Sequence, residues 1–108
     1  MSTPAGEGPI LLIVDFPARP PGGPEQAAAL RALAESIAQE PGLLWKIWTQ
    51  GAAEKRAGGV YLFADRASAE AYLRMHAERL GRMGITGIEA TYREINAPLS
   101  AITRGPVS

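Results

Sequence analysis

Three short segments of the chain carry apolar side chains at both odd and even positions. This pattern limits the kinds of fold that the chain can adopt. The segments are residues 10–16, 43–50 and 60–63. Each is rich in leucine, β-branched or aromatic side chains, a composition typical of β-strands. Because side chains alternate between the two faces of a strand, a sheet built from these segments is apolar on both faces.

Two amphipathic helices are predicted between the strands. The first begins at Pro24, which suits the first helical position, and runs to about Gln39, before Pro41-Gly42. The second runs from about residue 66 to 81, after Asp65, whose carboxylate makes a good N-cap. The side chains expected to face the sheet are Leu30, Leu33, Ala34 and Ile37 on the first helix and Ala69, Tyr72, Leu73, His76, Ala77 and Leu80 on the second.

A fourth strand is predicted at about residues 86–96, and Pro98 is expected to end regular structure. The resulting order, β-α-β-β-α-β, predicts an α+β fold of ferredoxin-like type, with an antiparallel sheet and two helices on one face. We expect residues 10–102 to form a single domain, between a flexible N-terminal tail at 1–9 and a C-terminal tail at 103–108.

The sheet face away from the helices needs a cover of its own. Soluble monomers rarely expose a large contiguous apolar patch. A second copy of the chain, related by a two-fold axis, would bury the same face on both protomers. The sequence therefore predicts a homodimer.

Composition excludes several classes of protein. Eleven basic and eleven acidic residues balance, and no basic cluster is longer than Lys55-Arg56, which argues against nucleic acid or an anionic membrane as partner. The absence of cysteine excludes disulfides and a thiol nucleophile. No apolar run reaches the ~18 residues of a membrane helix. The first residues lack the basic and apolar parts of a signal peptide, so a cytoplasmic protein is expected.

His76 is the only histidine and lies on the inner stripe of the second helix. It is a candidate general base or substrate hydrogen-bond partner, and the alternative is a histidine at the edge of the core bonded to a neighbour. One histidine without cysteine lacks the usual ligand set, so no metal site is expected. Gly58-Gly59 is followed by no phosphate-binding or dinucleotide pattern and is interpreted as a turn.

The two tryptophans, Trp45 and Trp48, are three residues apart in a predicted strand. They are therefore expected to face opposite sides of the sheet. The one that faces the helices lines a pocket with Tyr72 and His76, or both simply belong to the core.

Lys46 shares the side of Trp48 and is a candidate partner for an anion or enolate. The alternative is a lysine whose stem packs while its ammonium reaches water. Tyr61 and Tyr92 are candidate phenolic donors in a pocket, or half-buried tyrosines with hydrated hydroxyls.

Two strings of the sequence resemble a known family. They are Glu40-Pro41-Gly42-Leu43-Leu44-Trp45-Lys46-Ile47-Trp48-Thr49 and Ala57-Gly58-Gly59-Val60-Tyr61-Leu62-Phe63. Together with Asp65, Ser68-Ala69, Ala71-Tyr72-Leu73, His76, Arg79-Leu80 and the ending Ile95-Asn96-Ala97-Pro98-Leu99-Ser100, they make the chain similar to the YdhR-like monooxygenases. The resemblance covers roughly residues 10–102.

This resemblance implies a dimeric α/β barrel and kinship with small monooxygenases that oxidise aromatic or polyketide-like substrates without flavin or metal. The implied partners are a small phenolic or quinol-like aromatic and dioxygen, with no cofactor. The ionised substrate would pass an electron to dioxygen, while the protein supplies an apolar pocket and handles protons. The residue roles expected by position are proton handling for Tyr72 and His76, an aromatic wall for Trp45 or Trp48, and contacts to the anion for Lys46 and Tyr61.

Two other functions fit the same sequence. Since one fold hosts many activities, a non-catalytic small-molecule-binding dimer is the main alternative. An isomerase or a decomposing enzyme built on the same barrel is the other.

Overall fold

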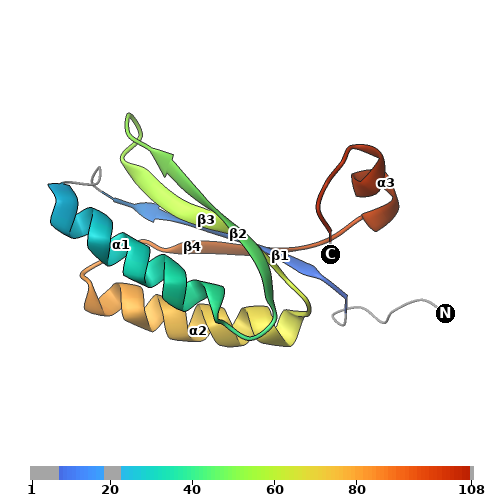
Figure 1. Cartoon of the computed structure of the whole chain (residues 1–108), viewed down its shortest axis with the longest axis horizontal. Helices are drawn as coiled ribbons and strands as arrows, with labels where there is room; N and C mark the ends of the chain where they lie inside the picture. Colours follow the sequence, from blue (N-terminus) through green and yellow to red (C-terminus); the bar gives the residue numbers. More distant parts are fainter. Residues whose placement is uncertain (1–7, 19–22, 108) are drawn as a thin grey trace.

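In a computed structural model, which describes residues 8–18 and 23–107, the chain forms one four-stranded antiparallel sheet with helices on one face. The elements are β1 (Ile10–Pro17), α1 (Gly23–Ala38), β2 (Leu43–Gly51), β3 (Arg56–Phe63), α2 (Arg66–Arg82), β4 (Glu89–Glu94) and α3 (Ala97–Ile102). The strand order is β2-β3-β1-β4. Figure 1 shows α1 and α2 side by side on one face, with α3 apart beyond one end of the sheet. The predicted ferredoxin-like α+β fold is confirmed, while most of the predicted N-terminal tail, residues 1–7, lies outside the described residues.

The interpretation of Gly58-Gly59 as a turn is wrong, because both glycines lie inside β3. A Cβ atom at Gly58 would come within 1.9 Å of the carbonyl oxygen of Val14 on β1. Glycine therefore lets β1 and β3 approach, a role that an isolated strand glycine often has. The strand begins four residues earlier than Val60, where the sequence placed it.

The C-terminal part also differs from expectation. Pro98 does not end regular structure but lies in the first turn of α3, where a proline loses no hydrogen bond. The side chain of Asn96 caps this helix by accepting from the backbone N–H of Leu99 at 3.1 Å. The fourth strand is shorter than predicted, starting at Glu89, because Gly87 adopts a φ of 71°.

A β-bulge in β2 decides which way its side chains point. The register shifts between Leu43 and Trp45, so Leu43 pairs with Phe63 while Trp45 pairs with Leu62. Leu43 and Trp45 therefore lie on opposite faces of the sheet, although simple alternation placed them together. The expectation that the two tryptophans face opposite sides is confirmed, because Trp48 is on the helix-covered face.

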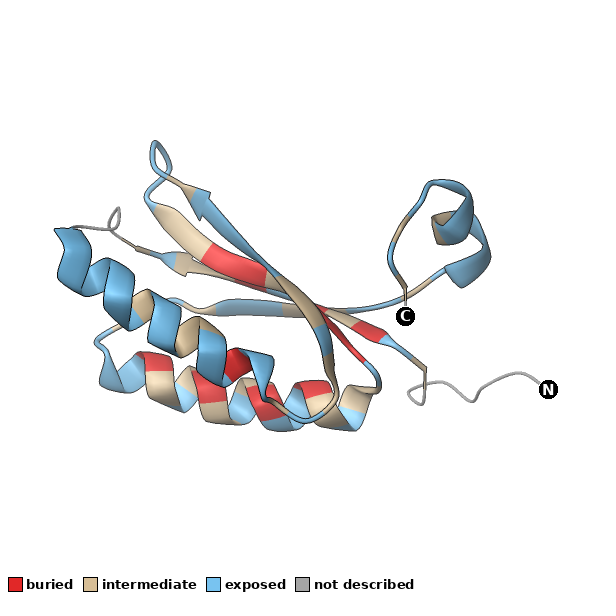
Figure 2. Ribbon diagram, viewed as in Figure 1, coloured by how far each residue is buried: buried red, intermediate tan, exposed pale blue. Residues whose placement is uncertain are grey.

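The helix-covered face, called the inner face below, carries the core. Its buried strand residues pack against α2 and against Ile37, the one buried residue among Gly23–Ala38 of α1. Figure 2 shows this contrast, with buried positions along α2 and an almost entirely exposed α1. The buried cluster is Ile10, Leu12, Val14, Ile37, Tyr61, Phe63, Ala69 and Tyr72. Among the described residues, no helix is long and apolar enough to span a bilayer.

The opposite face, called the outer face below, is apolar along β1, β2 and β3 near Leu62 but only partly covered. Leu62 is fully buried there, and its register neighbours are Leu11 and Trp45. The indole N–H of Trp45 donates to the backbone oxygen of Pro106 at 2.8 Å, which holds the end of the chain against this part of the sheet. Ile47, on the same face, remains 57% exposed.

Candidate functional site

A cavity of about 200 Å³ opens on the inner face, at the end where α1 begins and α2 ends. Its apolar wall includes Phe16, Leu30, Leu33, Leu80, Met83 and Ile85. Its polar and charged lining residues are Lys46, Arg56, Tyr61, His76, Gln26, Thr49 and Gln50. Within the described part of the chain, no acidic side chain lines it. Since cavities of about 150 Å³ hold benzene, this one has room for a small aromatic molecule.

Lys46 projects into the cavity from β2. Its Nζ lies 3.4 Å from the ring centroid of Trp48 and 4.6 Å from that of Tyr61. The stem lies across Gly59, where a Cβ atom would come within 2.5 Å of Lys46 Cε. Burial, and then the nearby Arg79 guanidinium, lower the pKa of Lys46 to about 7. The amine therefore exchanges its proton near neutral pH.

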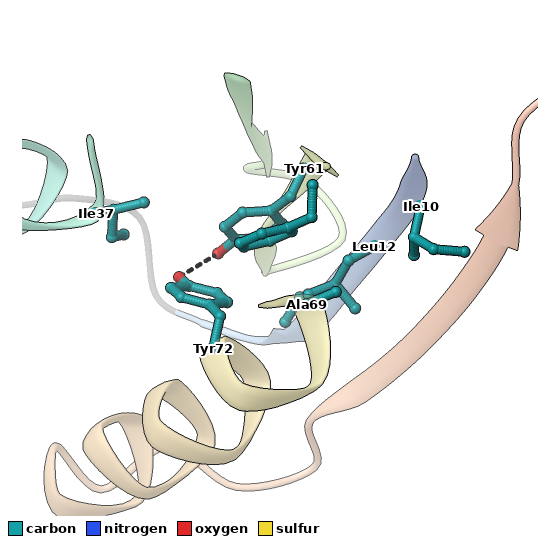
Figure 3. Close-up of a cluster of buried hydrophobic side chains, with 8 residues drawn as sticks. Ile10, Leu12, Ile37, Tyr61, Ala69 and Tyr72 are labelled. Atoms are coloured by element: carbon teal, nitrogen blue, oxygen red, sulfur yellow. Dashed lines mark hydrogen bonds between the residues drawn. The ribbon is translucent and has the colours of Figure 1, made fainter. Parts of the chain in front are cut away.

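Two tyrosines close the inner end of the site. The hydroxyl of Tyr72 donates to that of Tyr61 at 2.9 Å, and Figure 3 shows this bond between α2 and the sheet. Burial raises the pKa of both phenols, so both remain protonated at neutral pH. Tyr61 lines the cavity, whereas Tyr72 lies behind it in the core.

His76 is 3% exposed and its ring stacks on that of Tyr72, with centroids 5.0 Å apart. Its Nδ1 lies 3.3 Å from Arg79 Nε and 3.0 Å from Arg79 Nη2. Guanidinium only donates, so Nδ1 is the acceptor and the neutral ring carries its proton on Nε2. Burial, followed by the charges of Arg79 and Lys46, lowers the pKa of His76 to about 4. The imidazole is therefore neutral at physiological pH.

Arg79 is not among the side chains of the second helix that the sequence predicts to face the sheet, yet it contributes to the site. The guanidinium is part-buried and bonds His76. The signal was present in the sequence, because residues three apart on a helix share a side. The apolar stripe instead assigned this position to solvent.

The structure brings together four of the six predicted site residues, Lys46, Trp48, Tyr61 and His76, around one cavity. Tyr72 supports Tyr61 from behind. Trp45 lies on the outer face, away from the cavity, with its indole bonded to Pro106. In the ranges that the structure describes, no three His, Cys, Asp or Glu side chains gather where they could hold a metal ion.

A comparison with models of known protein families identifies the family of this chain. The sequence model described as "Putative mono-oxygenase ydhR" matches residues 11–106. The chain belongs to the ydhR family. Membership confirms the resemblance carried by the two strings and supports a monooxygenase-like function. No curated protein matches the chain.

A solved structure agrees with the ydhR fold. It is described as a putative antibiotic biosynthesis monooxygenase from Deinococcus radiodurans. That protein is 16% identical to this chain, and the match covers 81% of this chain and 92% of the other at a TM-score of 0.57. At that identity, the likeness supports the fold.

Proposed function

We propose that this member of the ydhR family is a cofactor-independent monooxygenase that acts on a small phenolic or quinol-like aromatic. The observation that carries the proposal is the cavity of about 200 Å³, whose wall is mostly apolar and includes an amine, a phenol and an imidazole. An apolar site with few fixed polar groups suits an aromatic ligand. It also strengthens the electrostatic stabilisation of an anion formed inside it.

In this mechanism the substrate itself, and not a cofactor, supplies the electrons that reduce dioxygen. The ionised aromatic gives one electron to dioxygen, and the resulting superoxide bonds to a ring carbon of the substrate radical. That carbon loses its hydrogen as a proton while the O–O bond breaks, leaving a ring carbonyl and releasing the second oxygen atom as water. The sum is phenol plus dioxygen giving quinone plus water, and the substrate supplies every electron.

Oxygen uptake tests this function. Metal-stripped protein would be given anthrones, quinols and catechols in the presence of a chelator, with labelled dioxygen. The expected result is uptake with one labelled atom in the product, and a loss of at least tenfold in His76→Gln and Trp48→Ala. Lys55→Met, on the exposed hairpin, is a control that should retain the activity. No uptake with any substrate would contradict the proposal.

The alternatives give different results in the same assay. A binding protein would retain an aromatic ligand and release it unchanged. An isomerase or a decomposing enzyme would convert its substrate equally well without oxygen.

The proposal includes a homodimer in which a second copy covers the outer face. Ile13 is 37% exposed and Ile47 57% exposed on that face, beside the covered Leu62. A two-fold axis between the outer faces of two copies would bury both isoleucines of each copy. The family resemblance implies the same arrangement. Light scattering at micromolar concentration should give twice the chain mass, and a mass near 11.4 kDa would contradict the dimer.

A further inference from the structure

We infer that Lys46, and not His76, takes the proton from the substrate's hydroxyl group and then holds the resulting anion. This inference rests on the proposed function, because it names the base and the substrate class for that same cavity. It assigns Lys46 a step of its own, whereas the family resemblance implies proton handling by Tyr72 and His76.

His76 is poorly placed to accept a proton. Its Nδ1 already accepts from Arg79, and its other nitrogen carries the ring proton. A second proton would put an imidazolium beside Arg79 and near Lys46, in a buried position. Both neighbours repel that charge, so His76 acts as a fixed neutral group in the wall.

Lys46, in contrast, is well placed to accept a proton. Within residues 8–18 and 23–107 it has no ion-pair partner, and its amine lines the cavity. The groups that face it are Arg79 and His76 from α2 and Tyr61 from β3. Arg56 also lines the cavity, but its guanidinium is paired with Asp15 and Glu89. The helix α1 adds only apolar side chains and Gln26 to the cavity wall.

The surroundings of Lys46 are compatible with both the neutral amine and the protonated ammonium. Burial and the Arg79 charge favour the neutral amine in the empty cavity. Once protonated, the ammonium lies over the faces of Trp48 and Tyr61, at 3.4 and 4.6 Å from their centroids. Aromatic faces attract a cation by about 0.5–2 kcal/mol in such contacts. The new anion adds a second attraction, because no carboxylate among the described lining residues competes for the ammonium.

The proton transfer is balanced between Lys46 and the substrate. The substrate O–H bond breaks, an N–H bond forms on Nζ, and the electron pair stays on the substrate oxygen. A neutral amine and a neutral hydroxyl become an ammonium and an anion, with no proton taken from or given to solvent. The substrate class is therefore an uncharged small aromatic with an acidic hydroxyl; an aromatic amine has no such proton and would not be ionised by Lys46.

The test uses 2-naphthol, whose anion absorbs at longer wavelength than the protein. At about pH 8, Lys46 is largely neutral and the free naphthol is un-ionised. Absorbance reports whether the bound naphthol is ionised. Calorimetry in two buffers of different protonation enthalpy reports how many protons the buffer gains on binding.

For the wild-type protein, we expect the anion band together with a proton release close to zero. Lys46→Met should lose the band. Lys46→Arg should keep it but release about one proton per naphthol, because arginine is always charged. His76→Gln should keep the anion band, because Lys46 is still present, and the control Lys55→Met should behave as wild type.

Three results would overturn the inference: no bound anion in the wild type, an anion band that persists in Lys46→Met, or a wild-type release of about one proton. Oxygen uptake measured on the same preparations separates the two proposals. Uptake that survives in Lys46→Met leaves the monooxygenase standing and removes Lys46 as its base. A Lys46-dependent anion with no uptake on any substrate removes the monooxygenase and keeps the base.

Discussion

The inner face of the sheet has a packed half and a hollow half, although one helix, α2, runs along both. In the packed half, Phe63 lies 5.3 Å from Tyr72 and 6.0 Å from Tyr61, measured between ring centroids. In the hollow half, the inward positions of β3 are Ala57 and Gly59. The inward side chains of β3 thus change from small to large along the strand. The small inward residues of β3 therefore leave the space that the cavity occupies, and Tyr61 lies at its boundary.

The largest expected effect compares one aromatic from each half. Phe63→Ala should lower the free energy of unfolding by about 3–5 kcal/mol, because the ring is fully buried. Trp48→Ala should cost less, about 2–3 kcal/mol, because 44% of Trp48 is exposed, yet it should abolish binding of aromatic ligands. Urea titration with a binding assay on both variants checks this. Equal destabilisation by the two substitutions would contradict the distinction between a packed half and a hollow half.

His76 gives the next largest effect, on the pH dependence of stability. Its pKa falls from 6.5 to about 4 on folding, so the unfolded chain takes up the proton first as the pH drops. The contribution of His76 to stability is thus full above about pH 6.5 and declines towards pH 4, by about 3 kcal/mol at most. The measurement is urea unfolding at several pH values for wild type and His76→Gln. If the free energy of unfolding varied with pH in the same way for both proteins, His76 would have the same pKa in the folded and unfolded chain, which would contradict the prediction.

The tyrosine pair at the boundary gives the smallest effect. Tyr61→Phe leaves the Tyr72 hydroxyl without its acceptor, and should cost about 1–2 kcal/mol. Tyr72→Phe should cost less, because the Tyr61 hydroxyl still faces the cavity. The double variant should cost less than the sum of the two, since it leaves no unpaired hydroxyl. Strict additivity in a double-mutant cycle would mean that the hydrogen bond contributes nothing.

Sequence patterns predict the inner stripe of α2 well, because Ala69, Tyr72, His76 and Leu80 follow helical spacing and all four are buried. The N-cap at Asp65 is also confirmed, with its carboxylate accepting from the backbone N–H of Ser68 at 2.7 Å. These features depend on neighbours in sequence.

Features that depend on distant neighbours were missed. Gly58 belongs in a strand only because β1 approaches it, and the local composition of a turn is the same. The bulge beside Leu44 follows from pairing with β3, so the alternation of β2 alone assigns Leu43 to the wrong face. Arg79 turns inward because it has a buried partner, His76, that a hydropathy pattern does not reveal.

The most direct measurement asks which face of the sheet holds the small molecule. The two tryptophans report one face each, with Trp48 on the cavity and Trp45 on the outer face. Trp45→Phe leaves Trp48 as the fluorophore, and Trp48→Phe leaves Trp45. Titration with 4-iodophenol, a heavy-atom quencher, should give saturable quenching in Trp45→Phe and none in Trp48→Phe. Saturable quenching of Trp45, with Trp48 unaffected, would place the ligand on the outer face and contradict the account.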